Sequence, residues 1–331
     1  MSATAPAVTS EAAARHALRR AQAARIVQQQ GGVAVFVLVA LAASLLSPGF
    51  ATSGNIQSIL VGNAYPALLA LGMTLVIITG GIDLSVGSVF ALGGVLGAFG
   101  AIHGGILLGL ALPLVVCGGW GLMQGVLIAR LRLPPFIVTL AGLLGARGLV
   151  QAVSSEGTVT YLIPTGSPFL ALGSGTWVPV VTVVVLFVLG GVVLQRTRFG
   201  QEVFALGGNE NAAVLMGVPV ARTKILVYLI SGLLAGLAGA LNAARLQSGI
   251  TNIGVGYELT AIAAVVIGGT LLTGGAGSVL GTVAGVLLLA VINNLIGVYL
   301  SQLGSAAADT VNGAVLAAVV LLQAYLSRAR R

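Results

Sequence analysis

Residues 57–101, QSILVGNAYPALLALGMTLVIITGGIDLSVGSVFALGGVLGAFGA, decide the fold class of this chain. They contain one charged side chain, Asp83, and the pair Gly80-Gly81 just before it divides the apolar run into two parts. A helix needs about 20 predominantly apolar residues to cross the hydrocarbon core of a membrane, and each part approaches that length. The stretch therefore predicts two transmembrane helices separated by a short polar break.

The whole chain has the same character. Of its 331 residues, 57% are hydrophobic and only 7% are charged, whereas a soluble globular protein carries about 25% charged residues. The apolar runs are continuous and rich in Leu and Ala, while membrane strands alternate over about ten residues. The sequence therefore predicts an all-α membrane protein.

We expect a polytopic bundle of about ten transmembrane helices. The predicted spans lie near residues 32–47, 57–79, 84–101, 105–129, 136–153, 177–194, 223–245, 258–271, 278–299 and 306–327. Residues 1–31 form a polar, basic tail, residues 32–327 the membrane domain, and residues 328–331 a basic C-terminus. The longest polar loop inside the domain covers residues 195–224.

The basic residues predict the orientation of the bundle. With the N-terminus in the cytoplasm, ten crossings place both termini and the loops after spans four and six on the cytoplasmic side. These segments hold Arg15, Arg19, Arg20, Arg25, Arg130, Arg132, Arg196, Arg198, Arg222, Lys224, Arg328, Arg330 and Arg331. Only Arg147 and Arg245 of the 15 Lys and Arg residues fall elsewhere. Cytoplasmic loops carry such an excess, so a multi-pass protein with both termini in the cytoplasm is expected.

Glycine makes up 49 residues, and many stand four apart within the predicted spans. Such pairs are Gly93 with Gly97, Gly121 with Gly125, Gly232 with Gly236 and Gly281 with Gly285. Small residues at this spacing let helix backbones approach closely in lipid. In a glycine-rich chain, chance alone would produce about half of such pairs, so the pattern predicts close packing without naming every contact.

The polar break at residues 79–88 has two interpretations. Asp83 caps span three in a short cytoplasmic turn, or the broken segment lines a solute path or a gate, as ionisable groups inside membranes often do. A second glycine-rich break follows at residues 268–278, and paired breaks in two halves point to a transporter site. Candidate path residues are Asn63, Thr74, Thr79, Asp83, Ser85, Asn293 and Asn294. Each of these polar groups can equally join one helix to another.

Loop 195–224 is predicted to contain a short helix at residues 209–216. Asn209 or Gly208 would cap it, Glu210 would occupy the first turn, where the helix dipole favours an anion, and Gly217 would end it. A helix of this kind can dock into a groove of a partner protein or rest on the membrane surface. Both alternatives fit the sequence.

Several functions are disfavoured by the residues present. A phosphate-binding loop needs Gly-Lys-Ser or Gly-Lys-Thr, but the only lysine, Lys224, stands between Thr223 and Ile225. No catalytic constellation is visible, and no His, Cys and carboxylate cluster has the spacing of metal ligands. The positive charges flank apolar segments and do not gather on one module. We therefore expect no enzymatic activity, no cofactor or metal bound by this chain, and no nucleic-acid partner.

Three segments in order resemble the permease subunits of bacterial ATP-binding cassette importers for simple sugars, such as the ribose, xylose and autoinducer-2 systems. They are Gly80–Ser88, Phe199–Gly217 and Gly256–Thr270, and the resemblance covers most of residues 32–327. It implies a location in the bacterial inner membrane, a separate ATPase subunit that uses the ATP, a second permease copy or a paralogue, and a soluble solute-binding protein. The solute itself stays open among pentoses, hexoses, autoinducer-like sugars and nucleoside-like compounds.

In that family, a cytoplasmic loop with the pattern Glu-Ala-Ala-x-x-x-Gly docks into the ATPase subunit. Residues 211–217 have this spacing, with Asn211 in place of the acid and Glu210 one position earlier. The resemblance thus implies an ATPase-coupling role for loop 195–224, carried by Glu202, Gly208, Asn209, Glu210, Asn211, Ala212, Ala213 and Gly217. The alternative function is a secondary, ion-coupled transporter, for which Asp83 would be the coupling group.

Overall fold

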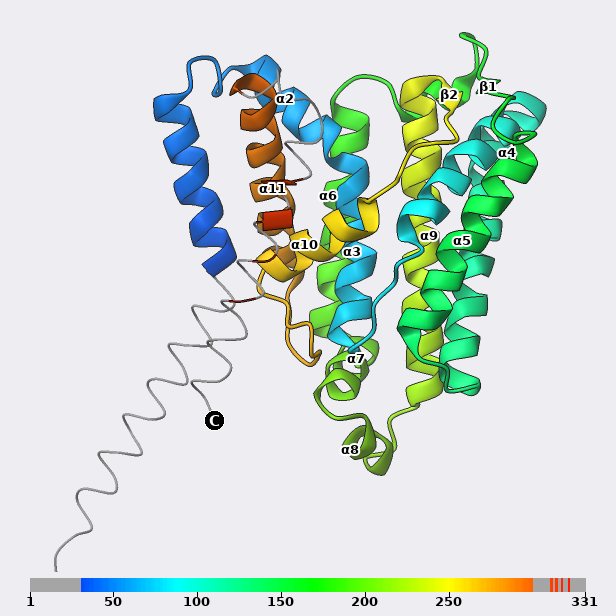
Figure 1. Ribbon diagram of the computed structural model, residues 1–331, viewed down its shortest axis with the longest axis vertical. Helices are drawn as coiled ribbons and strands as arrows, with labels where there is room; N and C mark the ends of the chain where they lie inside the picture. The colour runs from blue at the N-terminus through cyan, green and yellow to red at the C-terminus, as the bar shows by residue number, and fades with distance from the viewer. Residues whose placement is uncertain (1–30, 300–309, 312, 315–316, 318–320, 322–331) are drawn as a thin grey trace, which may run out of the picture.

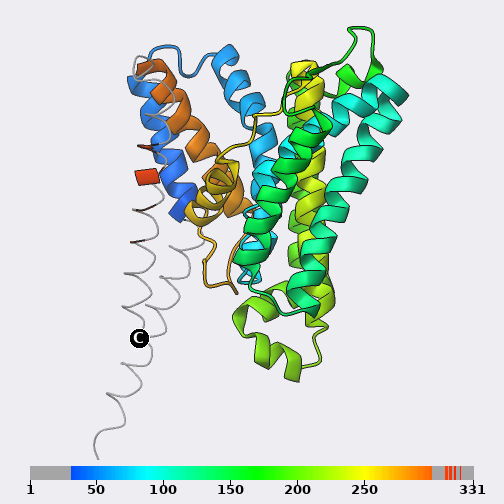
Figure 2. The same cartoon turned by 45° about the vertical axis from the view of Figure 1, so that its right-hand side comes forward.

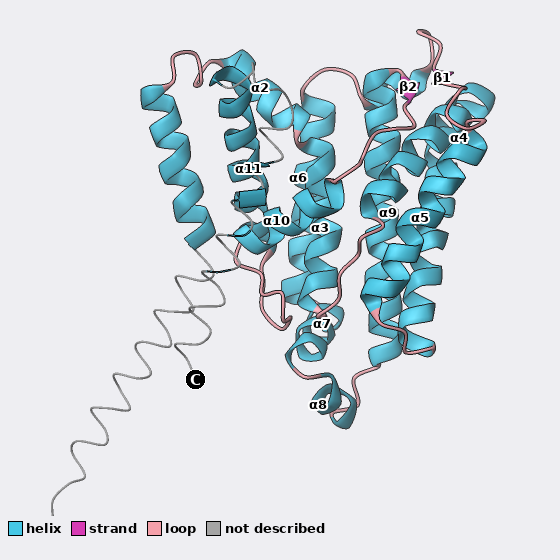
Figure 3. Cartoon of the chain, viewed as in Figure 1, coloured by secondary structure: helices cyan, strands magenta, loops and turns pink. Residues whose placement is uncertain are grey.

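The computed structural model describes residues 31–299 and residues 310, 311, 313, 314, 317 and 321 (Figure 1). Its helices are Gly31–Leu46, α2 (Ser53–Gly62), α3 (Ala64–Ile78), α4 (Val86–Arg130), α5 (Pro135–Val153), α6 (Trp177–Arg196), α7 (Arg198–Gly208), α8 (Glu210–Leu215), α9 (Val220–Leu246), α10 (Tyr257–Ile267) and α11 (Val279–Tyr299). Two short strands, β1 (Tyr161–Leu162) and β2 (Ser248–Gly249), pair antiparallel, and residues Pro168–Leu172 form a 3-10 turn. Helices thus make up most of the described part, and loops most of the rest (Figure 3).

The long helices stand side by side in one bundle, as two views of the chain show (Figures 1 and 2). One end of the bundle carries β1 and β2 and is called the β end, and the other carries α7 and α8 and is called the α8 end. Five described helices are long and apolar enough to cross a membrane, or six if the bent pair α2 and α3 counts as one. The prediction of an all-α, multi-pass membrane protein is confirmed.

Most predicted spans coincide with helices. The predicted spans 84–101 and 105–129 are the two arms of α4, which breaks at Gly104 and Gly105, where the backbone is not helical. The arms fold back on one another, and Gly100 of the first arm lies against the backbone of Leu108 of the second. The predicted span 57–79 begins earlier and is two helices that meet at 45°. Pro66 lies in the first turn of α3, where its missing N–H is tolerated.

The predicted spans 258–271 and 306–327 do not coincide with a described membrane-spanning helix. α10 has 11 residues and rises only about 16 Å, roughly half of a hydrocarbon core. The predicted helix at 258–271 was therefore too long, because the chain leaves the helix at Gly268 and continues as loop to Val279. The predicted span 306–327 and the basic tail lie almost wholly outside the described residues.

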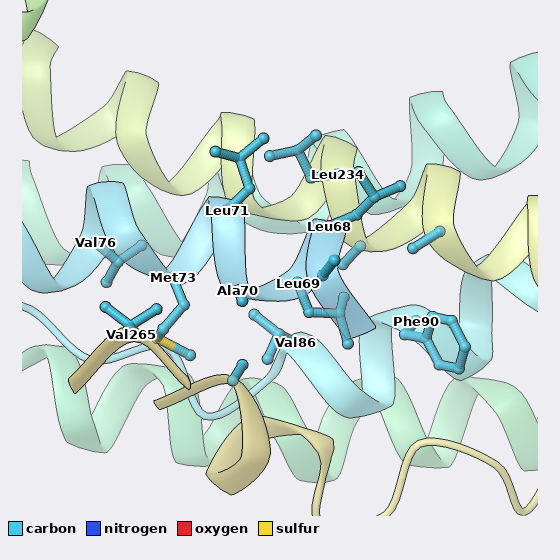
Figure 4. Packing of buried hydrophobic residues seen from close by; sticks show 14 of the residues in the cluster. Leu68, Leu69, Ala70, Leu71, Met73, Val76, Val86, Phe90, Leu234 and Val265 are labelled. Atoms are coloured by element: carbon cyan, nitrogen blue, oxygen red, sulfur yellow. The ribbon is translucent and has the colours of Figure 1, made fainter. Parts of the chain in front are cut away.

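The centre of the bundle is α3, which is buried along nearly its whole length. Figure 4 shows its side chains Leu68 and Met73 packed among Val86 of α4, Leu234 of α9 and Val265 of α10. α4 and α9 approach most closely through glycines: Gly93 lies against Gly236, and Gly121 against Gly232. All eight glycines of the four predicted pairs lie against a neighbouring helix or its loop, so the predicted close packing is confirmed.

Candidate solute path and coupling site

Two interrupted segments enter the bundle from opposite ends. Residues 80–85 run from the α8 end towards the middle and lead into α4, and residues 250–256 run from the β end towards the middle and lead into α10 (Figure 1). The two segments meet, since a β-carbon at Gly87 would overlap the carbonyl oxygen of Gly254 and the carboxylate of Glu258. The N-terminal ends of α4 and α10 therefore converge inside the bundle. Discontinuous helices that present such ends form the sites of many transporters.

Asp83 lies within this meeting region and is only 2% exposed. Its Oδ1 accepts hydrogen bonds from the backbone N–H (3.0 Å) and the hydroxyl (2.6 Å) of Ser85, and its Oδ2 accepts one from the hydroxyl of Ser231 (2.8 Å). The carboxylate thus holds Ser85, the residue just before α4, and also joins this segment to α9. It is enclosed by protein, neither exposed in a turn nor open to a cavity in this conformation.

Neighbouring side chains hold the same segment. The hydroxyl of Thr139 on α5 donates to the carbonyl oxygen of Ile82 (3.1 Å), and the Ser85 hydroxyl also lies 3.2 Å from Oε1 of Gln124. Within the described residues, the buried Nε2 of Gln124 and the buried hydroxyl of Tyr228 have no hydrogen-bond partner. An unpaired buried donor costs about 1–3 kcal/mol, so this polar cluster would gain from a rearrangement that supplies acceptors.

The structure separates the other predicted path residues. Asn63 and Asn293 line one small cavity of about 20 Å³ together with Thr260, which the sequence analysis missed. Thr79 ends α3 and bonds only its own helix, through the carbonyl oxygen of Val76 (2.7 Å).

Thr74 and Asn294 join helices instead of lining a cavity. The Thr74 hydroxyl lies 2.7 Å from that of Thr282 on α11, and Asn294 donates to Oδ1 of Asn55 (2.8 Å). The structure therefore brings Asp83 and Ser85 together, brings Asn63 and Asn293 together at a second place, and leaves Thr74, Thr79 and Asn294 apart.

A pair of opposite charges borders the meeting region. Nη1 of Arg147 on α5 donates to the carbonyl oxygens of Thr251 and Ile253, both at 3.0 Å, and Glu258 is its electrostatic partner. The carboxylate of Glu258 in turn lies against Gly87 at the start of α4. Arg147 was not among the predicted site residues. Its sequence signal was its position in a predicted span, away from the cytoplasmic basic clusters.

Loop 195–224 contains the predicted short helix and one helix more. α8 is capped by Asn209, whose side chain accepts a hydrogen bond from the N–H of Ala212 (3.0 Å), and Gly217 follows its end with a φ of 79°. α7 was not predicted, although Thr197 caps it by accepting a hydrogen bond from the N–H of Gly200 (3.3 Å). The predicted helix at 209–216 is confirmed.

α8 projects beyond the ends of the long helices (Figure 1). Its tip is apolar and exposed: Val214 is 57%, Leu215 89% and Met216 69% exposed. Glu210 is held by Lys224, whose Nζ lies 2.8 Å from both carboxylate oxygens. The neighbouring Asn211 is exposed. The surface offered to a partner is therefore apolar with an amide beside it.

The remaining predicted coupling residues act inside the chain. Glu202 accepts a hydrogen bond from the hydroxyl of Thr223 (3.0 Å) and so ties α7 to α9. Ala213 is buried, while Ala212 is partly exposed. These contacts fix the position of α7 and α8 relative to the bundle.

The end of α7 packs on the two glycine-rich breaks at a point that we call the glycine junction, formed by Gly80, Gly207, Gly208, Gly274 and Gly275. A β-carbon at Gly207 would overlap the carbonyl oxygen of Ile78, which accepts a hydrogen bond from the N–H of Gly275 (2.9 Å). The backbone of α7 thus contacts both the end of α3 and the loop after α10.

No group of three His, Cys, Asp or Glu side chains that could hold a metal ion occurs in the described part of the chain. The arrangement instead offers a buried carboxylate, two neutral amides with a hydroxyl, and an exposed apolar tip on the helix that follows α7. The amides and the hydroxyl can form hydrogen bonds with a polar solute, and the apolar tip can contact another protein.

The chain is similar to known proteins over most of its length. The family described as "Branched-chain amino acid transport system / permease component" matches residues 55–323. The chain is 41% identical to the ribose import permease protein of Bacillus subtilis, over 87% of this chain and 90% of that protein. It is 35% identical to the L-arabinose transport system permease protein of Escherichia coli (93% and 94%) and 37% identical to the fructose import permease protein of Bifidobacterium longum (80% and 81%). No solved structure matches the chain.

Proposed function

Because the chain belongs to the family of branched-chain amino acid transport system permease components, we propose that it is the membrane subunit of an ATP-driven importer for a sugar or a sugar-like solute. The observation that carries the proposal is the glycine junction. There, α7, which leads directly into the exposed α8, touches both glycine-rich breaks, one at the end of α3 and one in the loop after α10. A force applied to α8 therefore has a direct backbone route to the middle of the bundle.

The α8 end faces the cytoplasm in this proposal, where a separate ATPase subunit receives the apolar tip of α8 in a groove. A soluble solute-binding protein delivers the solute at the β end, and a second copy of the chain or a paralogue completes the path. Closure of the ATPase subunits on ATP moves α7. The backbone at Gly207 and Gly208 then transmits the movement to α3 and to the loop after α10, switching the bundle between outward-open and inward-open states.

The polar groups in the bundle favour a neutral, hydroxylated solute. Asn63, Thr260 and Asn293 present amides and a hydroxyl at one small cavity, and such groups exchange hydrogen bonds with sugar hydroxyls. The family description names amino acids, whereas the three relatives above are named for sugars. The ion-coupled alternative would rest on Asp83, but its oxygens already accept three hydrogen bonds from Ser85 and Ser231.

The test is uptake by proteoliposomes that contain the chain, the ATPase that co-purifies with it and its binding protein. Radiolabelled D-ribose, L-arabinose, D-fructose and L-leucine are offered separately, with ATP or with a non-hydrolysable analogue inside. We expect uptake of at least one sugar, and only with ATP. Uptake of leucine alone would refute the sugar assignment, and equal uptake without the ATPase would refute the importer.

A further inference from the structure

A second cavity, of about 760 Å³, lies between α3 with the adjoining end of α2, α6 and α11. Its walls are valines and leucines of α6 and α11, and its polar lining residues stand at the two ends: Asn63 at one, Gln195 and Arg196 at the other. Val184, Val188 and Leu280 on its rim are 54%, 60% and 70% exposed. The cavity therefore opens on the outer surface of the bundle.

A hydroxylated solute does not suit this cavity. A hydroxyl group buried without a hydrogen-bond partner costs several kcal/mol in a purely apolar surrounding, and the long walls offer no partner. Hydrocarbon fits them, because it loses nothing on leaving the lipid for a wall of valines. The cavity adjoins the small cavity assigned to the solute path, since Asn63 and Val286 line both, but the rest of its lining does not suit the solute.

Its length suits an acyl chain that begins at the membrane surface. From Val180 to Arg196, α6 rises about 24 Å, which is more than the roughly 15 Å thickness of one hydrocarbon leaflet. Arg196 is in the last turn of α6, just before the chain leaves the span for α7. Its guanidinium therefore lies at the level of the lipid headgroups.

The charge at that end selects the headgroup. Arg196 is exposed, and among the described residues no carboxylate lies within salt-bridge distance of it. Guanidinium groups bind phosphate through paired hydrogen bonds, and basic pockets between transmembrane helices hold anionic lipid headgroups. We propose that this cavity holds an anionic phospholipid, with an acyl chain between α6 and α11 and its phosphate at Arg196.

The experiment is native mass spectrometry of the full chain after equilibration in vesicles of equal parts phosphatidylglycerol and phosphatidylcholine. We expect phosphatidylglycerol to be retained about fivefold over phosphatidylcholine. Arg196→Gln should reduce this ratio to about one. The matched control is Arg198→Gln. It removes the same charge two positions further along the chain, from a residue that does not line the cavity, and it should keep the wild-type ratio.

A second variant removes the space without removing the charge. A β-carbon at Gly191 would meet only Val279, at 4.0 Å, so Gly191→Leu can fill the cavity without disturbing the backbone and should abolish retention of both lipids. Gly119→Leu is its control, because Gly119 is exposed, meets no atom within 4 Å and lies outside the cavity.

Three results of the lipid measurements would overturn the proposal. They are equal retention of the two lipids by the wild-type chain, an equal loss in Arg198→Gln, and full retention in Gly191→Leu. Disulfide-linked pairs of Leu280→Cys chains in vesicles would also overturn it, because they would assign the cavity to a second permease copy. None of these measurements depends on transport, so they separate this proposal from the importer function.

Discussion

The N–H of Gly275 donates a hydrogen bond to the carbonyl oxygen of Ile78 at 2.9 Å, and so fastens the loop after α10 to the end of α3. Gly207 of α7 lies directly on this pair. Three segments that are far apart in the sequence are thus held together by backbone groups, with no side chain between them. A displacement of α7 cannot be absorbed by side-chain rotation there, and it must move or break the bond.

The first prediction concerns Gly207. Gly207→Ala places a β-carbon on the carbonyl oxygen of Ile78, and overpacking of this kind costs about 1–3 kcal/mol. We expect ATP-driven uptake in proteoliposomes to fall about tenfold, the factor that corresponds to such an energy. Gly208→Ala is the control, because a β-carbon there meets no atom within 4 Å. Similar uptake by the two variants would show that the contact does not transmit movement.

The second prediction concerns Gly217, which ends α8 with a φ of 79°. A branched side chain in this left-handed conformation costs about 1–2 kcal/mol, so Gly217→Val should distort the end of α8. We expect ATP-coupled uptake to be lost while the chain still inserts in the membrane. Gly217→Asn should keep much of the uptake, since Asn tolerates this conformation. Normal uptake by Gly217→Val would argue against docking through α8.

The third prediction concerns the exposed tip of α8. Leu215 is 89% exposed, so Leu215→Asp should leave the thermal-unfolding midpoint unchanged. It should nevertheless prevent co-purification of the ATPase subunit, because it places a charge in an apolar interface. The control is Asn211→Asp, which introduces the same charge at an exposed position where the coupling pattern has an acid, and it should retain the ATPase. An ATPase bound equally well by Leu215→Asp would instead favour α8 resting on the membrane surface.

The fourth prediction concerns the bond between Asp83 and Ser231 (2.8 Å). A hydrogen bond to a charged group contributes about 1.5–3 kcal/mol, so Asp83→Asn and Ser231→Ala should each destabilise the chain in detergent. The loss of stability in the double variant should be smaller than the sum of the two single losses by about 1.5–3 kcal/mol, the contribution of the shared hydrogen bond. Additive losses would mean that the two residues do not act on one another.

The sequence located most spans because lipid imposes a simple demand, a long apolar run that satisfies its own backbone as a helix. It also located the break of α4, since Gly104 and Gly105 interrupt the run. It failed on the end of α10 because Leu271 and Leu272 continue the apolar pattern beyond Gly268. Apolarity reports depth in the membrane, and it does not report whether the backbone there is helical.

The site was harder to predict, because its contacts join residues that are far apart in the chain. The sequence predicts Asn294 as a path residue, because nothing in it shows that Asn294 bonds Asn55, which lies 239 positions earlier in the chain. Arg147 gave no hint that it would hold the carbonyl oxygens of Thr251 and Ile253. The caps of α8 were predictable because Asn209 and Gly217 contact or adjoin residues only a few positions away in the chain.

The burial of α3 has a consequence for biogenesis. Its neighbours α9 and α10 are translated long after it. A nascent α3 is therefore exposed to lipid until these helices enclose it. The leucines and isoleucines of α3 are stable in contact with lipid. Asp83, in the segment after α3, is not, because its partner Ser231 has not yet been translated. A chain truncated before α9 would leave this carboxylate without its partner on α9, a defect that the quality-control proteases of a membrane can recognise.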